Sequence, residues 1–251
     1  MNRYLRNLGK IEFVLTYRCT GSCKHCSVGE KHDFTKIDPS LAAAAVTQIA
    51  REYNIKTVMV FGGEPLLHPD AVEKIMRAAT EMNIEKRQII TNGFFSQDEN
   101  EISEMASRIA ASGANDVLLS VDAFHQETIP ISPVIRFAQK IKEYGVPIRL
   151  QPAWLVSKAD KNPYNEKTRE ILDKLSYLEI PESDGNVVFP EGNAKKYLAE
   201  YFTESSPENP YTEDPCNVKC LSFSPNGDVL ESNIYEKDLL EIIKDYNPKT
   251  S

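Results

Sequence analysis

Short apolar runs rich in β-branched residues recur along the chain, and segments with helical periodicity separate them. Between the first two runs, Val46, Ile49, Ala50 and Tyr53 follow the i, i+3, i+4, i+7 spacing of a helix with one apolar face. The runs predict strands at residues 11–17, 57–61, 87–91, 116–121, 147–155 and 186–189. Further helices are expected near residues 69–82, 98–112, 134–141, 165–177 and 193–202. Six strand–helix units with nearly continuous apolar strands predict an α/β fold, in which helices cover a parallel sheet.

Polar residues and glycines follow the carboxyl ends of these predicted strands. In parallel sheets, whether open or closed into a barrel, the loops at the carboxyl ends carry the chemistry. We therefore expect all six loops to project onto one functional face. The residues concerned are Cys19–Cys26, Gly62-Gly63-Glu64-Pro65, Thr91-Asn92-Gly93, Ser120 with Asp122 and His125, Gln151 within the fifth strand, and Pro190-Glu191-Gly192.

The loop after the first strand carries Cys19, Cys23 and Cys26 in a C-x3-C-x2-C pattern. Three thiolates can ligate three irons of a [4Fe-4S] cube and leave the fourth iron open to a small molecule. A zinc site is the alternative, with His25 or His32 as a fourth ligand, but no second cluster of ligands lies nearby. Disulfides are disfavoured by the odd, sparse count of five cysteines and by the absence of any mark of secretion.

The composition narrows the functional classes. The 251 residues are 41% hydrophobic and 26% charged, which is typical of a globular chain of one large domain, or of one domain with an appendage. The net charge of −8 and the lack of a Lys/Arg run argue against nucleic-acid binding. No window reaches the length of a membrane span, and free thiols without a signal peptide favour the cytoplasm.

The three-cysteine loop after the first strand and Gly62-Gly63-Glu64-Pro65 after the second resemble the radical S-adenosylmethionine (SAM) superfamily over roughly residues 10–195. Residues 190–194 are similar to a small Pro-x-Gly-x-Ala signature of such enzymes. The resemblance implies a partial (β/α)6 barrel, a [4Fe-4S] cluster ligated by Cys19, Cys23 and Cys26, and SAM on the open iron. It further implies that a donor such as flavodoxin or ferredoxin reduces the cluster, and that a 5′-deoxyadenosyl radical then removes hydrogen from a substrate C–H bond.

The resemblance also implies roles for the loop after the second strand. Gly62 and Gly63, followed by Pro65, would let the backbone approach the methionyl end of SAM. Glu64 would accept a hydrogen bond from the ammonium group of SAM.

Other loop residues have two interpretations each. His25 would pack near the adenine of SAM, or be a surface loop residue. His125 is a candidate for a substrate contact or a proton shuttle, or else begins a helix without a functional role. The candidate ribose or methionyl contacts, which are also ordinary turn residues, are Asn92, Ser120 and Asp122, with Gln151 as a weaker candidate on position alone.

The C-terminal part is less regular. Residues 203–215 are rich in Pro, Ser and acids and predict a linker between a core of residues 1–202 and an extension of residues 216–251. Leu221–Ser224, a turn at Pro225–Gly227 and Val229–Leu230 predict a β-hairpin, and residues 236–245 predict a helix. The extension resembles a shortened SPASM or twitch domain, but Leu230, Glu231 and Ser232 stand where another cysteine is usual.

Cys216 and Cys220 leave three interpretations open. Two thiolates are too few for an auxiliary cluster held by cysteine alone, so a second cluster would need other ligands. Buried structural cysteines are the preferred interpretation. Donation of a hydrogen atom from a thiol to a substrate radical is the alternative with a catalytic role.

Three functional classes follow. The SPASM-like tail favours a radical SAM enzyme that modifies a peptide or protein. The second class acts on a nucleobase, a small metabolite or a partner enzyme, as glycyl-radical activases do. The third is a non-catalytic iron–sulfur or zinc module. The three cysteines together with Glu64 argue against this third class, because a binding module has no need of an open iron.

Overall fold

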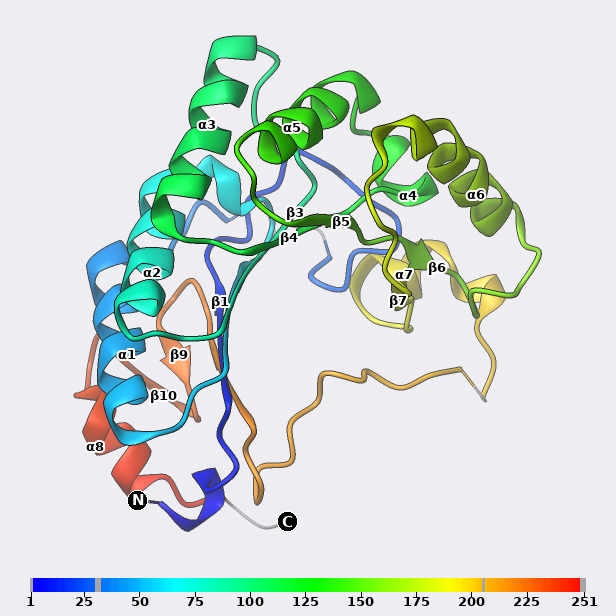
Figure 1. Cartoon of the computed structure of the whole chain (residues 1–251). Coiled ribbons are helices and arrows are strands. Elements are labelled where there is room, and N and C mark those ends of the chain that lie inside the picture. The colour runs from blue at the N-terminus through cyan, green and yellow to red at the C-terminus, as the bar shows by residue number, and fades with distance from the viewer. Residues whose placement is uncertain (1, 30–32, 205, 249–251) are drawn as a thin grey trace.

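The computed structural model describes residues 2–29, 33–204 and 206–248. Its centre is a six-stranded, all-parallel sheet in the order β5-β4-β3-β2-β1-β8. Figure 1 shows that this sheet is curved, with the long helices on its outer side. The predicted α/β fold is confirmed. The strands are β1 (Lys10–Val14), β2 (Thr57–Phe61), β3 (Lys86–Thr91), β4 (Asp116–Leu119), β5 (Ile148–Leu150) and β8 (Cys220–Phe223).

A two-stranded parallel sheet of β6 (Ala153–Trp154) and β7 (Asn186–Val187) extends the fold beyond β5. The predicted strand at residues 147–155 is therefore two short strands, because Pro152 has no N–H group to continue the ladder. Backbone hydrogen bonds from Leu150 N to Pro181 O and from Asn186 N to Pro152 O, both 2.9 Å long, join this region to β5. The strands together form a partial barrel of the radical SAM type, as the resemblance implied.

The helices follow the strands in the predicted alternation. Several begin at a side-chain cap: the Asp38 carboxylate accepts hydrogen bonds from Ser40 N and Leu41 N at the start of α1. The α-helices are α1 (Pro39–Glu52), α2 (Pro69–Glu81), α3 (Glu99–Ser112), α4 (Ala123–Gln126), α5 (Ile131–Glu143), α6 (Pro163–Leu175), α7 (Gly192–Tyr197) and α8 (Leu239–Asp245). Short 3-10 helices lie at η1 (Arg3–Leu5), η2 (Pro65–Leu67), η3 (Ser176–Leu178) and η4 (Ala199–Tyr201).

The two faces of the curved sheet differ in polarity. Side chains alternate along each strand, so Ile11 and Phe13 of β1 face the helices and are fully buried, while Lys10 and Glu12 face the inner side. The core lies between the sheet and the helices. It includes Phe13 stacked on Phe223 of β8, with ring centroids 4.9 Å apart.

The C-terminal hairpin differs from the predicted one. Residues 220–223 form β8, which pairs in parallel with β1 and not with residues 229–230, so that prediction was wrong. The physical reason is the apolar pair Leu221 and Phe223, which completes the helix-side core beside β1. The actual hairpin joins β9 (Asp228–Val229) to β10 (Ser232–Asn233), and its two turn residues have positive φ, as a type I′ turn requires.

The chain between η4 and β8 crosses from one edge of the barrel to the other (Figure 1). The described residues of 203–215 contain no helix or strand, which agrees with a linker. The division into a core and an extension stays a prediction, since β8 belongs to the main sheet. No helix in the described ranges has the length and apolar character needed to cross a membrane.

Candidate active site at the carboxyl ends of the strands

The three cysteine thiols lie in one loop between β1 and α1. Cys23 is buried, Cys26 is half-buried and Cys19 is exposed. Burial, with Glu64 and Cys26 nearby, raises the pKa of Cys19 to about 11. The pKa of Cys23 is also raised, first by burial and then by the neighbouring charges of Asp122, Cys19 and Cys26. The thiols therefore influence one another, and a bound cation is needed to keep them deprotonated at neutral pH.

Gly62 and Gly63 fit the second-strand loop against the cysteine loop. A Cβ atom on Gly63 would lie 2.0 Å from Arg18 O, and one on Gly62 would lie 2.6 Å from Thr16 O. Backbone hydrogen bonds join the same segments, from Gly63 N to Thr16 O (2.7 Å) and from Glu64 N to Arg18 O (2.9 Å). The close approach that these glycines permit is therefore to the chain's own backbone. Their predicted approach to SAM stays a prediction.

Residues 192–193, at the start of α7, hold the other side of the cysteine loop. Asn193 N donates to Cys26 O (2.9 Å), and Asn193 Nδ2 donates to Cys23 O (3.1 Å). Gly192 has a φ of 51°, and a Cβ there would lie 2.5 Å from Cys26 O. Sequence reasoning noticed the Pro-x-Gly-x-Ala pattern but missed Asn193, whose position at a helix start resembles an ordinary cap.

Glu64 is fully buried and joins the ends of β2 and β3. Its Oε1 accepts hydrogen bonds from Leu66 N (2.9 Å) and Thr91 Oγ1 (2.7 Å), and its Oε2 accepts one from Asn92 N (2.9 Å). Burial raises the pKa of Glu64 to about 7. Pro65, also buried, begins η2 directly after it. The carboxylate is thus a structural tie, and one lone pair of Oε2 is left for a ligand.

Asn92 contacts the cysteine loop from the end of β3. Its Nδ2 donates to Cys19 Sγ (3.5 Å) and to Thr20 Oγ1 (3.1 Å). Gly21 N is a second donor to Cys19 Sγ, at 3.4 Å. Two N–H groups therefore point at one cysteine sulfur, an arrangement that favours its thiolate form.

Asp122 is fully buried and orients His125. Its Oδ1 accepts from His125 N (3.0 Å), and its Oδ2 accepts from His125 Nδ1 (2.8 Å) and Ala153 N (2.9 Å). Burial alone would raise the pKa of Asp122, but the charge and hydrogen bonds of His125 lower it to about 2. Asp122 is thereby engaged within the chain, and its predicted contact with ribose stays a prediction.

His25 lies inside the site and is not a surface loop residue. Its ring centroid is 4.8 Å from that of Phe124 and 4.8 Å from that of His125. Its Nδ1 is buried and has no hydrogen-bond partner in the described part of the chain. Burial, followed by the charge of His125, lowers the pKa of His25 to about 4, so the ring is neutral. The predicted contact with adenine stays a prediction.

Two further candidates lie at the same edge of the sheet or near it. Ser120 follows β4 and is half-buried, with its N–H bonded to Thr91 O at 2.8 Å. Gln151 is turned toward β7, where its amide bonds Ser183 Oγ (2.6 Å) and Asn186 Oδ1 (3.2 Å).

Cys216 and Cys220 do not join this group. Cys220 begins β8 and pairs with Lys10, the first residue of β1, so it lies at the opposite end of the strands from the cysteine loop. Cys220 is half-buried and Cys216 is exposed. In the described ranges, neither belongs to a set of three or more His, Cys, Asp or Glu side chains able to hold a metal ion. This observation gives no support to a second cluster with mixed ligands.

Comparisons with known proteins agree with this geometry. The chain matches the family described as "Radical SAM superfamily" over residues 13–201. "Probable GTP 3',8-cyclase" of Saccharolobus solfataricus is 26% identical over 221 residues, which cover 82% of this chain and 68% of that protein. The protein of the same name from Saccharolobus islandicus is 26% identical over 264 residues, covering 99% and 78%.

Solved structures show the same fold. Streptococcus suis SuiB bound to S-adenosylmethionine superimposes with a TM-score of 0.64 and 17% identity, covering 97% of this chain and 67% of that one. The enzyme anSMEcpe with bound AdoMet gives a TM-score of 0.60 with 15% identity, covering 96% and 80%. These likenesses concern the fold alone, whereas the family match spans more than half of the chain. This chain belongs to the radical SAM superfamily.

Proposed function

We propose that this radical SAM protein removes a hydrogen atom from a C–H bond of a small polar substrate of the purine-nucleotide class. The observation that carries the proposal is the inner face of the sheet, where charged side chains lie at the amino end of the strands and apolar ones nearer the cysteine loop. The substrate class rests on the relatives, whose names specify GTP.

The protein uses a [4Fe-4S] cluster and SAM, as its superfamily does. Together these two groups supply a 5′-deoxyadenosyl radical that takes a hydrogen atom from the substrate. Cys19, Cys23 and Cys26 would hold the cluster, and the N–H groups of Asn92 and Gly21 at the Cys19 sulfur fit it, because hydrogen bonds to such sulfurs tune cluster properties. Glu64 would bind the SAM ammonium through the unused lone pair of Oε2.

We define the polar floor as Lys10, Glu12, Gln88, Asp116 and Arg149, which lie on the inner face toward the amino ends of the strands. Lys10 and Glu12 form an ion pair of 2.7 Å. Asp116 accepts two hydrogen bonds from Arg149 (3.1 and 2.8 Å) and one from Gln88 Nε2 (2.7 Å). Positive and negative groups balance there. A group with both donors and acceptors, such as the edge of a purine base, can exchange with these pairs.

Apolar side chains separate the polar floor from the cysteine loop. Val14, Phe61 and Ile90 face inward one step above the floor residues of their own or neighbouring strands, and Leu118 faces inward on β4. A substrate anchored by a polar group at the floor would place its C–H bonds in this layer, which limits water beside the radical. The names of the relatives favour the nucleotide class over the peptide class suggested by the tail, because SuiB resembles this chain in fold alone.

The test is anaerobic turnover with a panel of substrates. Cluster-loaded protein, reduced with dithionite and supplied with SAM, should form more 5′-deoxyadenosine with GTP than with ATP or a short peptide. GTP carrying deuterium at C3′ or C8, the two positions that the relatives' name specifies, should pass deuterium to 5′-deoxyadenosine from one of them. No stimulation by any purine nucleotide, together with stimulation by a peptide, would overturn the substrate class.

The polar floor has its own variants. Arg149→Gln should weaken substrate binding about tenfold to a hundredfold, because it removes charge-assisted hydrogen bonds of roughly 1.5–3 kcal/mol. Arg51→Gln, on the exposed side of α1, is the matched control and should leave substrate binding unchanged. Equal behaviour of the two variants would show that the floor does not bind the substrate.

A further inference from the structure

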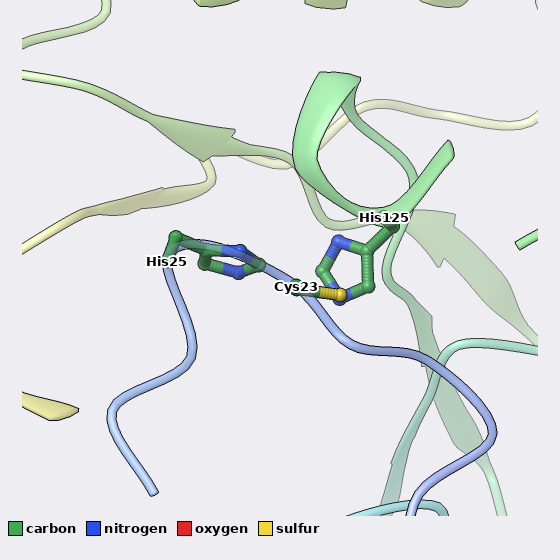
Figure 2. A group of neighbouring side chains, drawn as sticks. All are labelled: Cys23, His25 and His125. Atoms are coloured by element: carbon green, nitrogen blue, oxygen red, sulfur yellow. The ribbon is translucent and has the colours of Figure 1, made fainter. Parts of the chain in front are cut away.

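Cys23, His25 and His125 bring three metal-ligand atoms together between the cysteine loop and α4 (Figure 2). One ligand atom from each side chain lies within 4.8 Å of the other two. Two of the residues come from the cysteine loop, and His125 comes from α4. Within residues 2–29, 33–204 and 206–248, no other set of three such side chains meets this condition.

Asp122 prepares His125 for ligation. A charged carboxylate can only accept hydrogen bonds, so Nδ1 of His125 carries the proton in the 2.8 Å contact with Asp122 Oδ2. The lone pair of the neutral ring then lies on Nε2. A carboxylate bonded to the second nitrogen of the ring is the usual support of a metal-bound histidine. The hydrogen bonds from Ala153 N and His125 N fix Asp122 itself.

His25 supplies an independent observation. Its Nδ1 is buried and has no partner in the described part of the chain, although the ring is held in place beside Phe124 and His125. A buried polar atom without a partner costs about 1–3 kcal/mol, so such atoms are uncommon and indicate an unseen ligand. Cys23, next to it, is only 7% exposed.

We propose that Cys23, His25 and His125 bind one zinc-type divalent ion when the chain lacks its cluster, and that the ion and the cluster exclude each other because both require Cys23. One sulfur and two imidazole nitrogens are a donor set that suits zinc and cobalt, with a fourth position open to water. Bonds of about 2.3 Å to sulfur and about 2.0 Å to nitrogen put tetrahedral ligand atoms about 3.5 Å apart. The three side chains need to close by about 1 Å. Binding releases the thiol proton of Cys23 to solvent.

Cobalt(II) is the probe for the first experiment, because its visible absorption reports both tetrahedral geometry and a thiolate ligand. Titration of the anaerobic, cluster-free full chain should show one cobalt per chain. Cys23→Ala, His25→Gln and His125→Gln should each weaken binding by about a hundredfold or more, because a ligand is lost. Cys19→Ala is the matched control: it removes a cluster ligand and should leave cobalt binding unchanged.

Iron loading provides the second measurement. Without zinc, His125→Gln should assemble about four irons per chain, as the normal protein does, which also shows that the variant folds. After incubation with one equivalent of zinc, the normal protein should resist cluster assembly, whereas His125→Gln should not. The proposal is overturned if Cys19→Ala abolishes cobalt binding while His125→Gln retains it, or if no stoichiometric cobalt binds. These outcomes are independent of whether GTP is the substrate.

Discussion

Replacing Glu64 with glutamine tests whether this buried carboxylate ties the β2 and β3 loops together. The amide has a donor where glutamate has an acceptor. If NH2 takes the place of Oε2, Asn92 N loses its partner, and if it takes the place of Oε1, Leu66 N loses its partner. The Thr91 hydroxyl can rotate to suit either arrangement. One buried backbone N–H is therefore left unsatisfied in both orientations.

An unsatisfied buried N–H costs about 1–3 kcal/mol, so the unfolding equilibrium constant should rise about fivefold to 150-fold at low pH, where Glu64 is protonated in both states. Urea unfolding of the cluster-free chain can measure this change through the fluorescence of Trp154, the one tryptophan, which is 3% exposed. Glu104→Gln, at an exposed position of α3, is the matched control and should change the free energy of unfolding by less than about 0.5 kcal/mol.

The pH dependence supplies the sign of the effect. The pKa of Glu64 is raised from 4.5 to about 7 in the folded chain, so folding favours the protonated form. The normal protein should be most stable relative to Glu64→Gln below pH 4.5, and should lose this advantage as the pH rises through about 7. The linkage relation gives a loss of about 2 kcal/mol between pH 5 and pH 7, and little further change above pH 8.

Two results would refute the reasoning about Glu64. One is a Glu64→Gln variant that unfolds at the same urea concentration as the normal protein at every pH. The other is a difference that grows as the pH rises, which would indicate a carboxylate that the fold prefers in its charged form.

Other substitutions test the site and the tail. Gly63→Ala should cost more than about 3 kcal/mol of stability and lower iron content, because its Cβ would meet backbone atoms of Arg18 that cannot move aside, and normal iron loading would contradict this contact. Asn193→Ala should weaken iron retention through loss of its bond to Cys23 O, whereas Asn209→Ala, on the exposed linker, should not; equal retention would exclude the anchoring role. Cys220→Ala should lower stability and leave 5′-deoxyadenosine formation and iron content unchanged. Solvent deuterium in the product of the normal enzyme, together with failed turnover of this variant, would instead show hydrogen donation.

The strand positions were predictable because apolar runs report local burial, and the partner of β8 was not, because pairing is decided far along the chain. Pro225-Asn226-Gly227 is a strong local turn signal, and it does close a turn, with Gly227 N bonded to Ser224 O. What it could not reveal is the packing of Phe223 on Phe13, which draws β8 to the edge of the main sheet.

The positions of the site residues were predictable for a similar reason, whereas several of their contacts were not. The carboxyl ends of parallel strands meet at one edge, so the cysteines, Glu64, Asn92 and Asp122 come together from four loops. Their hydrogen-bond partners depend on three-dimensional contacts between those loops. The Glu64 carboxylate bonds the end of β3, and Asp122 bonds a histidine three residues on and the backbone of Ala153.

The register of β8 also separates the interpretations of Cys220. Four residues of β1 lie between the level of Cys220 and the end of the strand at Val14, a rise of about 13 Å before the cysteine loop begins. A thiol that donates hydrogen must reach the carbon radical, which forms beside SAM at the cysteine loop. Cys220 instead faces Glu12, whose carboxylate accepts its thiol hydrogen bond, and burial raises its pKa first of all. A protonated thiol held at the polar floor fits a structural role, or a contact with the polar end of the substrate, better than hydrogen donation at the reacting carbon.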